Sequence, residues 1–282
     1  MMILDGIKIK NLILDEVKEE VIELGVKLKL VIIQVGNENA SDVYVKQKFN
    51  MCNYVGYDFH HIKLDSDIDT EYLVSLINDL NDDDSVTGIL VQLPLPNGID
   101  NDKVLNTISY LKDVDGLSNI NKEKLVNVED GLFSCTPLGV MELLNRYNIS
   151  VDGKNVVILG RSELVGKPLS TMIRNKGGNV TVCHSKTEDI FMYTKNADII
   201  ISAVGKIKVL TGNMVRDGAI VIDVGINRCE NGICGDVDFE SVKDKCSYIT
   251  PVPGGVGPMT VAMLAKNVTK AYKLQKKNRN QM

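Results

Sequence analysis

The sequence lacks the residue patterns that would indicate a metal site. It contains six cysteines and only three histidines, and no two cysteines form a C-x-x-C pair. A zinc site is therefore not expected. Cysteines scattered in this way, in a chain that shows no secretory segment, are typical of the reducing cytosol. We therefore predict a cytoplasmic protein that holds no metal.

Long apolar runs and an excess of basic charge are missing as well. No stretch approaches the roughly 18 apolar residues of a membrane span. The formal net charge is -5 at pH 7, so the chain has no basic footprint for nucleic acid. What remains is an ordinary globular composition, in which 44% of the residues are hydrophobic and 24% are charged. With 282 residues, the chain is long enough for two domains or one large one.

The first part of the chain alternates strand-like runs with helical stripes. The run from Leu30 to Val35 is continuously apolar and ends at Gly36, whereas residues 13–24 repeat apolar side chains at helical spacing. Strands that alternate with helices indicate a parallel α/β unit. The predicted order is a helix over 13–24, a strand over 30–35, a helix over 41–55, a strand over 60–64, a helix over 72–80 and a strand over 86–92.

A second series of the same kind begins near Pro137. A strand over 155–159 is followed by Gly160 and a helix from about Leu164, which is the order of a nucleotide-binding half-fold. A Pro/Gly-rich connection, 251–258, can carry the chain back to the first domain. The other predicted elements are a helix over 137–147, strands over 179–183, 198–203 and 219–224, and a last helix over 259–275.

An aromatic ring, an amine and an amide mark a candidate site in the first series. Tyr44 and Lys48 are four residues apart in a predicted helix, so they share one helix face. Gln92 ends a predicted buried strand, and ligands bind at the strand ends of parallel sheets. The three side chains suit a flat, polar heterocycle that undergoes proton chemistry. The alternative is that Tyr44 and Lys48 are solvated helix surface and that Gln92 satisfies local backbone groups.

The segment from Gly160 to Gly166 lies where a phosphate-binding loop is expected, between a strand and a helix. It departs from G-x-G-x-x-G, because Ser162 replaces the second glycine and Val165 the third. If it binds a phosphate, backbone N–H groups and the helix N-terminus receive the anion. Ser162 then crowds the position of closest approach, so that the cofactor could lie in a different pose. The alternative is an ordinary strand-to-helix turn with a glycine at positive φ.

The end of the next strand indicates which dinucleotide would bind. An NAD site places an acid there to hold the ribose 2′-hydroxyl, but the chain continues with residues 184–186, which include no acid. Arg161 in the first loop and the Ser185 hydroxyl would instead bind a 2′-phosphate. We therefore predict NADP rather than NAD. The alternative is that 184–186 is only a polar loop.

Two further loops should face the same crevice. Residues 202–206 and 223–227 each follow a predicted strand and carry a glycine, which lets backbone approach a ligand. The backbone of Ile226 could contact the nicotinamide amide. For each loop taken singly, a simple turn is the alternative.

A series of motifs runs in order along nearly the whole chain. They are Val35-Gly36, Ala40-Ser41, Tyr44 with Lys48, Gly88 to Pro96, Lys112 to Gly116, Cys135-Thr136-Pro137, Gly160-Arg161-Ser162, Cys183-His184-Ser185 and Pro251 to Thr260. This series resembles the family of bifunctional methylenetetrahydrofolate dehydrogenase/methenyltetrahydrofolate cyclohydrolase enzymes. The blocks 88–96 and 251–260 are highly specific together. The sequence departs from the family pattern at Asn39, where a proline is usual.

The resemblance implies two α/β domains around a cleft. The first, residues 1–136 with the C-terminal helix 258–282, would bind folate and carry the catalytic groups. The second, residues 137–257, would be a Rossmann-like NADP-binding sheet through which two copies join as a homodimer. The implied reactions are oxidation of 5,10-methylenetetrahydrofolate to the methenyl form with NADP, and then hydrolysis to 10-formyltetrahydrofolate. They belong to one-carbon metabolism, which serves purine and amino-acid biosynthesis.

The resemblance also implies that Lys48 lies beside the reacting carbon. We expect it to act as the general acid/base of the hydrolysis, in the neutral form, because an ammonium would repel the cationic intermediate and burial lowers a lysine pKa. Gln92 can orient the amine without fixing it as a cation. Tyr44 would stack against the folate. Asp115 is the candidate pterin anchor, since a carboxylate can accept two hydrogen bonds, although Asp113 could be mistaken for it.

The remaining candidate residues lie in turns. Pro253 and Gly254 belong to the Pro/Gly-rich loop, which we expect to shape the folate pocket through backbone groups. The alternative is that this loop is a rigid hinge. The run 112–116, which holds Asp115, could likewise be a plain charged turn.

Two rival functions remain open at this point. One is an NADP-dependent oxidoreductase of another small substrate, such as a shikimate-type dehydrogenase. The other is a non-catalytic module that binds folate or a nucleotide. The second rival would require that Lys48 or Gln92 be lost, and both are present.

Overall fold

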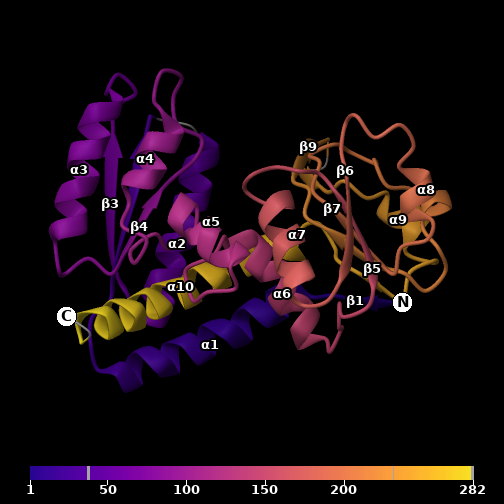
Figure 1. Ribbon diagram of the computed structural model, residues 1–282, viewed down its shortest axis with the longest axis horizontal. Coiled ribbons are helices and arrows are strands. Elements are labelled where there is room, and N and C mark those ends of the chain that lie inside the picture. Colours follow the sequence, from indigo (N-terminus) through magenta and orange to yellow (C-terminus); the bar gives the residue numbers. More distant parts are fainter. Residues whose placement is uncertain (37–38, 231, 281–282) are drawn as a thin grey trace. The chain divides into compact units, whose positions relative to one another are not determined.

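The computed structural model of the chain divides into two compact units (Figure 1). It describes residues 1–36, 39–230 and 232–280 without the side chains of 39–41, so the departure at Asn39 lies outside the described side chains. The three-stranded unit, which we name after its sheet, consists of Leu12–Cys135 and Val261–Met282. The six-stranded unit consists of Met1–Asn11 and Thr136–Thr260.

A parallel sheet in the order β3-β2-β4 forms the middle of the three-stranded unit. Residues 30–33 of its central strand are at most 1% exposed, as is typical of a parallel sheet that is covered on both faces. The strands are β2 (Lys29–Val35), β3 (Asp58–Leu64) and β4 (Gly88–Val91). The helices are α2 (Asn39–Val55), α3 (Thr70–Asp82), α4 (Asn101–Thr107), α5 (Asn119–Val126) and most of α1 (Gly6–Leu24) and α10 (Val256–Arg279).

The six-stranded sheet is parallel throughout, in the order β1-β11-β8-β7-β5-β6. After β5 the chain adds β6 on one side and then β7 and β8 on the other, so the strand order reverses between β5 and β7. This reversal is the arrangement of Rossmann-like dinucleotide-binding sheets. The strands are β1 (Met2–Ile3), β5 (Asn155–Leu159), β6 (Asn179–Cys183), β7 (Ile199–Ser202), β8 (Ile220–Asp223) and β11 (Tyr248–Ile249). The unit also holds α6 (Cys135–Arg146), α7 (Gly166–Asn175), α8 (Phe191–Thr194), η1 (Gly212–Met214), the β9 (Asn227–Cys229) and β10 (Gly232–Cys234) hairpin, and α9 (Phe239–Val242).

The fold class expected from the sequence, with two α/β domains of which the second is Rossmann-like, is confirmed. Two strands, β5 and β6, have the predicted bounds residue for residue. Both terminal helices are longer than predicted, since α1 begins at Gly6 and α10 runs from Val256 to Arg279. Sequence reasoning missed β1 and β11, because each has only two residues and they pair across a long stretch of chain.

The first residues, Met1–Asn11, belong to the six-stranded unit and not to the region of residues 12–135 with which they were expected to fold. β1 pairs with β11 in the larger sheet. At the start of α1, the carbonyl oxygen of Gly254 accepts hydrogen bonds from Gly6 N at 2.9 Å and Ile7 N at 3.2 Å. These long-range contacts are invisible to a pattern read along the sequence.

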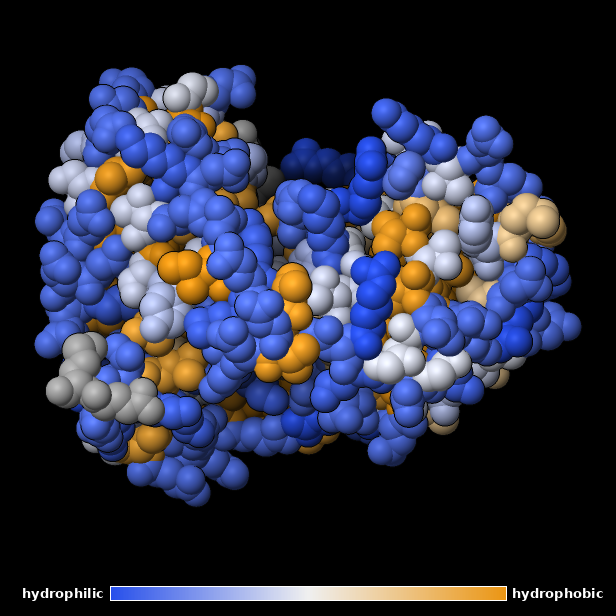
Figure 2. Space-filling view, in the orientation of Figure 1, coloured by the Kyte–Doolittle hydropathy of each residue, from blue (hydrophilic) through white to orange (hydrophobic). Residues whose placement is uncertain are grey.

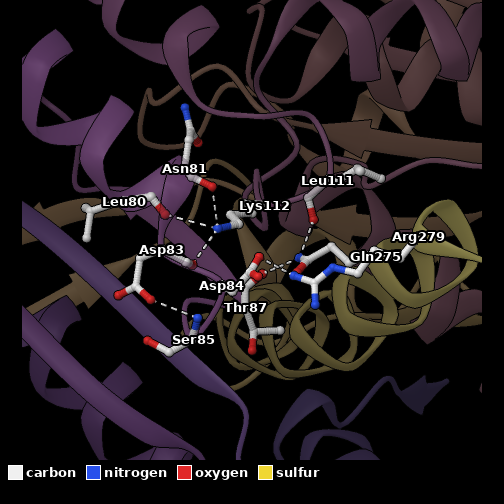
Figure 3. A network of polar contacts seen from close by, with 10 residues as sticks. All are labelled: Leu80, Asn81, Asp83, Asp84, Ser85, Thr87, Leu111, Lys112, Gln275 and Arg279. Carbon is white, nitrogen blue, oxygen red and sulfur yellow. Dashed lines mark hydrogen bonds and ion pairs between the residues drawn. The ribbon is translucent and has the colours of Figure 1, made fainter. Parts of the chain in front are cut away.

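The last helix is anchored in the three-stranded unit by polar contacts from its C-terminal half (Figure 3). Gln275 Nε2 donates to Thr87 O at 2.8 Å and to Leu111 O at 2.9 Å. Arg279 forms an ion pair with Asp84. The predicted return of the C-terminal helix to the first domain is therefore confirmed.

Lys112 closes the end of α3 (Figure 3). The residue is 6% exposed, and its Nζ donates to the carbonyl oxygens of Leu80, Asn81 and Asp83 at 3.0, 2.7 and 2.8 Å. The last carbonyls of a helix have no partner within the helix, and an ammonium group supplies three donors. Lys112 thus fixes where the following segment, 113–116, begins.

Hydrophobic side chains form small groups among polar ones on the face that Figure 2 shows. Over the described ranges, we find no helix with the length and apolar character that a membrane span requires. Some large apolar side chains are exposed at strand ends, among them Val204 after β7 and Ile226 after β8.

Candidate functional site

The carboxyl ends of both sheets offer places for a site, because a reversal of strand order leaves a crevice there. In the three-stranded sheet the order reverses between β2 and β4. Gly36 follows β2, and Gln92 follows β4. The helix that comes after β2 is α2, which carries Tyr44 and Lys48.

Lys48 and Gln92 are in direct contact. Lys48 Nζ donates a hydrogen bond to Gln92 Oε1 at 2.8 Å. Gln92 Nε2 donates to Leu93 O at 2.8 Å, which fixes the amide with its oxygen toward the amine. The backbone N–H of Gln92 also donates to Ile33 O at 2.8 Å and so ties the residue to the central strand. Gln92, which accepts the hydrogen bond from Lys48, is therefore held in place by two hydrogen bonds that it donates itself.

Burial lowers the pKa of Lys48, which is the main electrostatic feature of this site. Asp115, Cys135 and Cys52 act in the opposite direction but do not reverse the shift. Burial raises the pKa of Cys52 to about 12, and that of Cys135 rises well above its usual value, so both thiols stay uncharged at neutral pH. Asp115 is thus the single ionisable group of the three that can hold negative charge beside the amine.

Asp115, the predicted pterin anchor, and Asp113, which could be mistaken for it in the sequence, have different surroundings. Asp113 is 1% exposed, and its carboxylate accepts from Leu117 N at 3.2 Å, Ser118 N at 2.8 Å and Asn121 Nδ2 at 2.9 Å. These bonds hold the turn that leads into α5. The oxygens of Asp113 are therefore engaged in the fold, which leaves Asp115 as the candidate for binding a ligand.

Asp115 is half-buried and shares its environment with Lys48. Burial raises the pKa of its carboxyl group, the positive charge of Lys48 lowers it, and the nearby Asp113 raises it again. Contact with Cys135 also favours the charged form. Amine and carboxyl therefore each shift the titration of the other, so that the protonation of one depends on that of its neighbour.

Sequence reasoning missed Asn267, which braces the segments on either side of this group. Its Nδ2 donates to Val114 O and Phe133 O, both at 2.9 Å, and lies 3.6 Å from Cys135 Sγ. The signal was present in the sequence, because Asn267 is an amide on a helix face that is otherwise apolar, and it is 3% exposed. Asn267 therefore links α10 to Val114, the residue before Asp115, and to the segment 133–135 that holds Cys135.

Tyr44 lies one helical turn before Lys48 on α2, so the two share a face of that helix. Its side chain is 42% exposed, whereas Lys48 is half-buried. An exposed ring next to a partly buried amine is suited to stacking on a flat ligand.

In the six-stranded unit, Gly160 lies at the point where the strand order reverses. Its φ is +115°, and a Cβ there would lie 2.3 Å from Ala203 O in the loop after β7. Its N–H donates to Cys183 O at 2.8 Å, at the end of β6. A Cβ on Gly166, the first residue of α7, would lie 2.3 Å from Gly160 O. Only glycine fits at these two positions, and the close packing brings three strand ends together.

Ser162 closes the turn that leads into α7. Its hydroxyl accepts from Val165 N at 3.2 Å and Gly166 N at 3.4 Å. The serine that we expected to crowd a cofactor thus has a structural function in the turn. Within the part of the chain that the structure describes, the N–H groups of Arg161, Ser162 and Glu163 have no acceptor in the protein. Unpaired amides before a helix N-terminus fit a phosphate group.

The other predicted cofactor residues lie at the same edge of the sheet. Arg161 and Ser185 are exposed and follow the adjacent strands β5 and β6. Ile226, after β8, is 51% exposed, and Val204, after β7, is 38% exposed. Apolar side chains that remain open at such an edge suit contact with a flat ring. The residues therefore fit a dinucleotide that carries an additional phosphate.

Pro253 and Gly254 belong to the six-stranded unit. Pro253 is exposed, and Gly254 has a φ of +108°. Because the Gly254 carbonyl binds the start of α1, the backbone here is fixed by the fold itself. Their predicted contact with substrate stays a prediction.

These features define an α/β protein with a Rossmann-like dinucleotide sheet in one unit and a lysine–amide site in the other. Comparison with family models agrees with both parts. Residues 4–115 match the catalytic domain of tetrahydrofolate dehydrogenase/cyclohydrolase, and residues 134–276 match its NAD(P)-binding domain. The chain therefore belongs to the tetrahydrofolate dehydrogenase/cyclohydrolase family, which the sequence motifs predicted.

Individual relatives match over almost their full length. The bifunctional protein FolD of Agathobacter rectalis is 50% identical over 275 residues, which are 96% of this chain and 99% of the relative. The crystal structure of the bifunctional FolD methylenetetrahydrofolate dehydrogenase/cyclohydrolase from Campylobacter jejuni is 49% identical, with a TM-score of 0.95 over 98% of this chain and 99% of that one. The Trypanosoma brucei enzyme, solved with NADP and an inhibitor, is 35% identical, with a TM-score of 0.92 over 98% of each chain.

Proposed function

We propose that this protein oxidises 5,10-methylenetetrahydrofolate to 5,10-methenyltetrahydrofolate with NADP and hydrolyses the product to 10-formyltetrahydrofolate, with Lys48 as the general acid/base. The single observation that carries the assignment of Lys48 is its amine, which burial keeps at a lowered pKa and which an uncharged amide orients. A neutral amine tolerates a cationic substrate, and it can take up a proton. Family membership sets aside the alternative of a shikimate-type dehydrogenase.

The hydrolysis consumes one water and releases one proton. Water loses its first proton as its oxygen adds to the methenyl carbon; as the bond from that carbon to the ring nitrogen breaks, the nitrogen gains a proton and the new hydroxyl group loses its proton to solvent, which leaves the formyl C=O. Lys48 in its neutral form accepts the proton from the attacking water, and the resulting ammonium delivers it to the ring nitrogen. Gln92 Oε1 accepts a hydrogen bond from Nζ in both states and so holds the amine in place during the cycle.

The oxidation requires mainly that substrate and cofactor be positioned. NADP, when bound, accepts the hydride. Gly160 and the free amides of Arg161 and Ser162 would hold the pyrophosphate, and the Arg161 and Ser185 side chains would hold the 2′-phosphate. The backbone at Ile226 would hold the nicotinamide amide.

The folate would be held mainly by the three-stranded unit, which includes most of the domain 1–136 with the C-terminal helix 258–282. Tyr44 would stack on the ring system. Asp115 would accept hydrogen bonds from a ring N–H and the adjacent amino group, since its carboxylate does not hold the turn before α5 as that of Asp113 does. Pro253 and Gly254 would add backbone contacts. The second domain, 137–257, would bind the dinucleotide.

We also propose that the protein is a cytoplasmic homodimer joined through the six-stranded unit. The six cysteines are free, which fits a reducing compartment. β6 is the last strand of its sheet, so one of its edges is open to a second copy. Beside it, Met192 and Tyr193 of α8 are exposed and line the same hollow as residues 179–181. Light scattering in solution should give twice the 31.1 kDa chain mass, and a monomer would contradict the proposal.

Replacement of Lys48 by methionine tests the proposed mechanism. Methionine keeps an unbranched side chain, one atom shorter, but removes the proton carrier, so cyclohydrolase activity should fall by at least about 100-fold. The decay of methenyltetrahydrofolate absorbance measures this rate, and circular dichroism shows whether the fold is intact. Lys46→Met is the matched control, because Lys46 is exposed on the same helix. Ring opening at the normal rate in the Lys48 variant would remove this residue from the mechanism.

A further inference from the structure

A buried carboxylate lies behind the proposed cofactor site without a function so far. Asp236 follows the β9–β10 hairpin and is 0% exposed. Its two oxygens receive five hydrogen bonds. Oδ2 accepts from Ser202 Oγ at 3.1 Å, Val204 N at 2.7 Å and Gly205 N at 3.2 Å, and Oδ1 accepts from Lys206 N and Asn227 Nδ2, both at 3.0 Å.

The donors to Asp236 come from two separate loops at the carboxyl edge of the sheet. Residues 202–206 end β7 and form the loop on which Gly160 packs, through Ala203 O. Asn227 follows Ile226 and begins β9, at the end of the loop after β8. Gly225 in the second loop must be glycine, because a Cβ there would lie 2.1 Å from Asp236 Oδ1. One side chain therefore fixes both loops.

Asp236 is itself held firmly. Asp223, at the end of β8, accepts from Asp236 N at 3.0 Å and from Val237 N at 2.8 Å. The backbone N–H of Asp223 donates in turn to the Thr250 hydroxyl oxygen at 2.7 Å. The carboxylate of Asp236 is thus connected to the sheet through two buried side chains, which is how a precise position is maintained.

We infer that Asp236 is a positioning residue for the dinucleotide, an inference that rests on the proposed function. Its carboxylate accepts hydrogen bonds from the backbone N–H groups of residues 204–206, so these groups are bonded within the protein. The Val204 and Ile226 side chains stay exposed at the edge where the nicotinamide would lie. An amide cannot replace the carboxylate, since asparagine would turn an NH2 group toward N–H donors.

Asp236→Asn is the direct test, and it is read out in two ways. In the cofactor-free protein, amide hydrogen exchange at residues 204–206 should become faster, because these N–H groups lose their acceptor. Equilibrium binding of NADP, followed by calorimetry, should weaken by at least about tenfold. The rate of ring opening, which needs no dinucleotide, reports any general defect in folding.

The control is Asp238→Asn, two residues further on, where the carboxylate forms a surface ion pair with Lys208. This variant should bind NADP as the wild type does. Faster exchange in the Asp236 variant together with unchanged NADP affinity would overturn the inference, because the loops would then not belong to the cofactor site. If the wild-type protein itself failed to bind NADP, the proposed function would fail instead.

A milder variant keeps the inference testable if Asp236→Asn does not fold. Asn227→Ala removes one of the five hydrogen bonds and leaves the carboxylate with the other four. NADP binding should weaken by a few fold. Affinity equal to that of the wild type in a folded Asn227→Ala protein would overturn the inference as well.

Discussion

The two sheets place their candidate sites at equivalent edges but equip them with different groups. At the three-stranded sheet the proposed groups are side chains, Lys48, Gln92 and Asp115, and burial shifts the pKa of the two that ionise. At the six-stranded sheet the proposed groups are mainly backbone N–H groups after Gly160, while the carboxylate of Asp236 holds the neighbouring loop at residues 204–206. The first site depends on side chains that can change their charge, and the second depends on backbone groups held in fixed positions.

This difference follows from the two chemical tasks. Proton transfer at neutral pH requires a group that can change its charge, and a lysine does so only where burial lowers its pKa. Binding of a phosphate requires fixed donors that never change their charge, and backbone N–H groups meet this condition. The same reversal of strand order thus supports either task, depending on which residues follow the strands.

Gln92→Glu is expected to have the larger of two effects that would sharpen this comparison. A carboxylate would then lie within hydrogen-bond distance of Lys48 Nζ, in place of the neutral oxygen now at 2.8 Å. An opposite charge raises a lysine pKa, so the neutral amine becomes scarcer at pH 7 and cyclohydrolase activity falls by about 100-fold. Activity should recover as the pH rises, because deprotonation restores the free amine. A pH–rate profile measures the shift.

Gln92→Met separates charge from orientation in the same experiment. It removes the hydrogen-bond acceptor without adding a charge, so the rate should fall while the acid limb of the profile does not move to higher pH. If Gln92→Glu left the acid limb where the wild type has it, the lysine would not be the titrating group. The site at the three-stranded sheet would then not differ from the one at the six-stranded sheet in depending on a group that changes its charge.

The sequence predicted the parts of each site that depend on local order, and missed those that depend on distant contacts. The helical spacing of Tyr44 and Lys48 and the strand before Gly160 were both readable along the chain. The family motif pointed to Asp115, but the different structural task of Asp113 was not readable along the chain, because it depends on which carboxylate binds the turn before α5. Asp236 was missed for the same reason, since its partners lie up to 34 residues away.

Arg161→Ala is expected to have the smaller effect, and it tests the candidate dinucleotide site at the six-stranded sheet. Arg161 is exposed beside the phosphate-binding turn, so its loss should remove a charge-assisted bond to the 2′-phosphate and leave the backbone cradle intact. The KM for NADP should rise by about tenfold, and that for NAD should change little. Arg174→Ala, at the other end of α7, serves as the control. Steady-state kinetics with both dinucleotides gives the two ratios. Equal losses for NADP and NAD would mean that Arg161 supports the turn itself, and the six-stranded site would then owe its preference for the extra phosphate to another group.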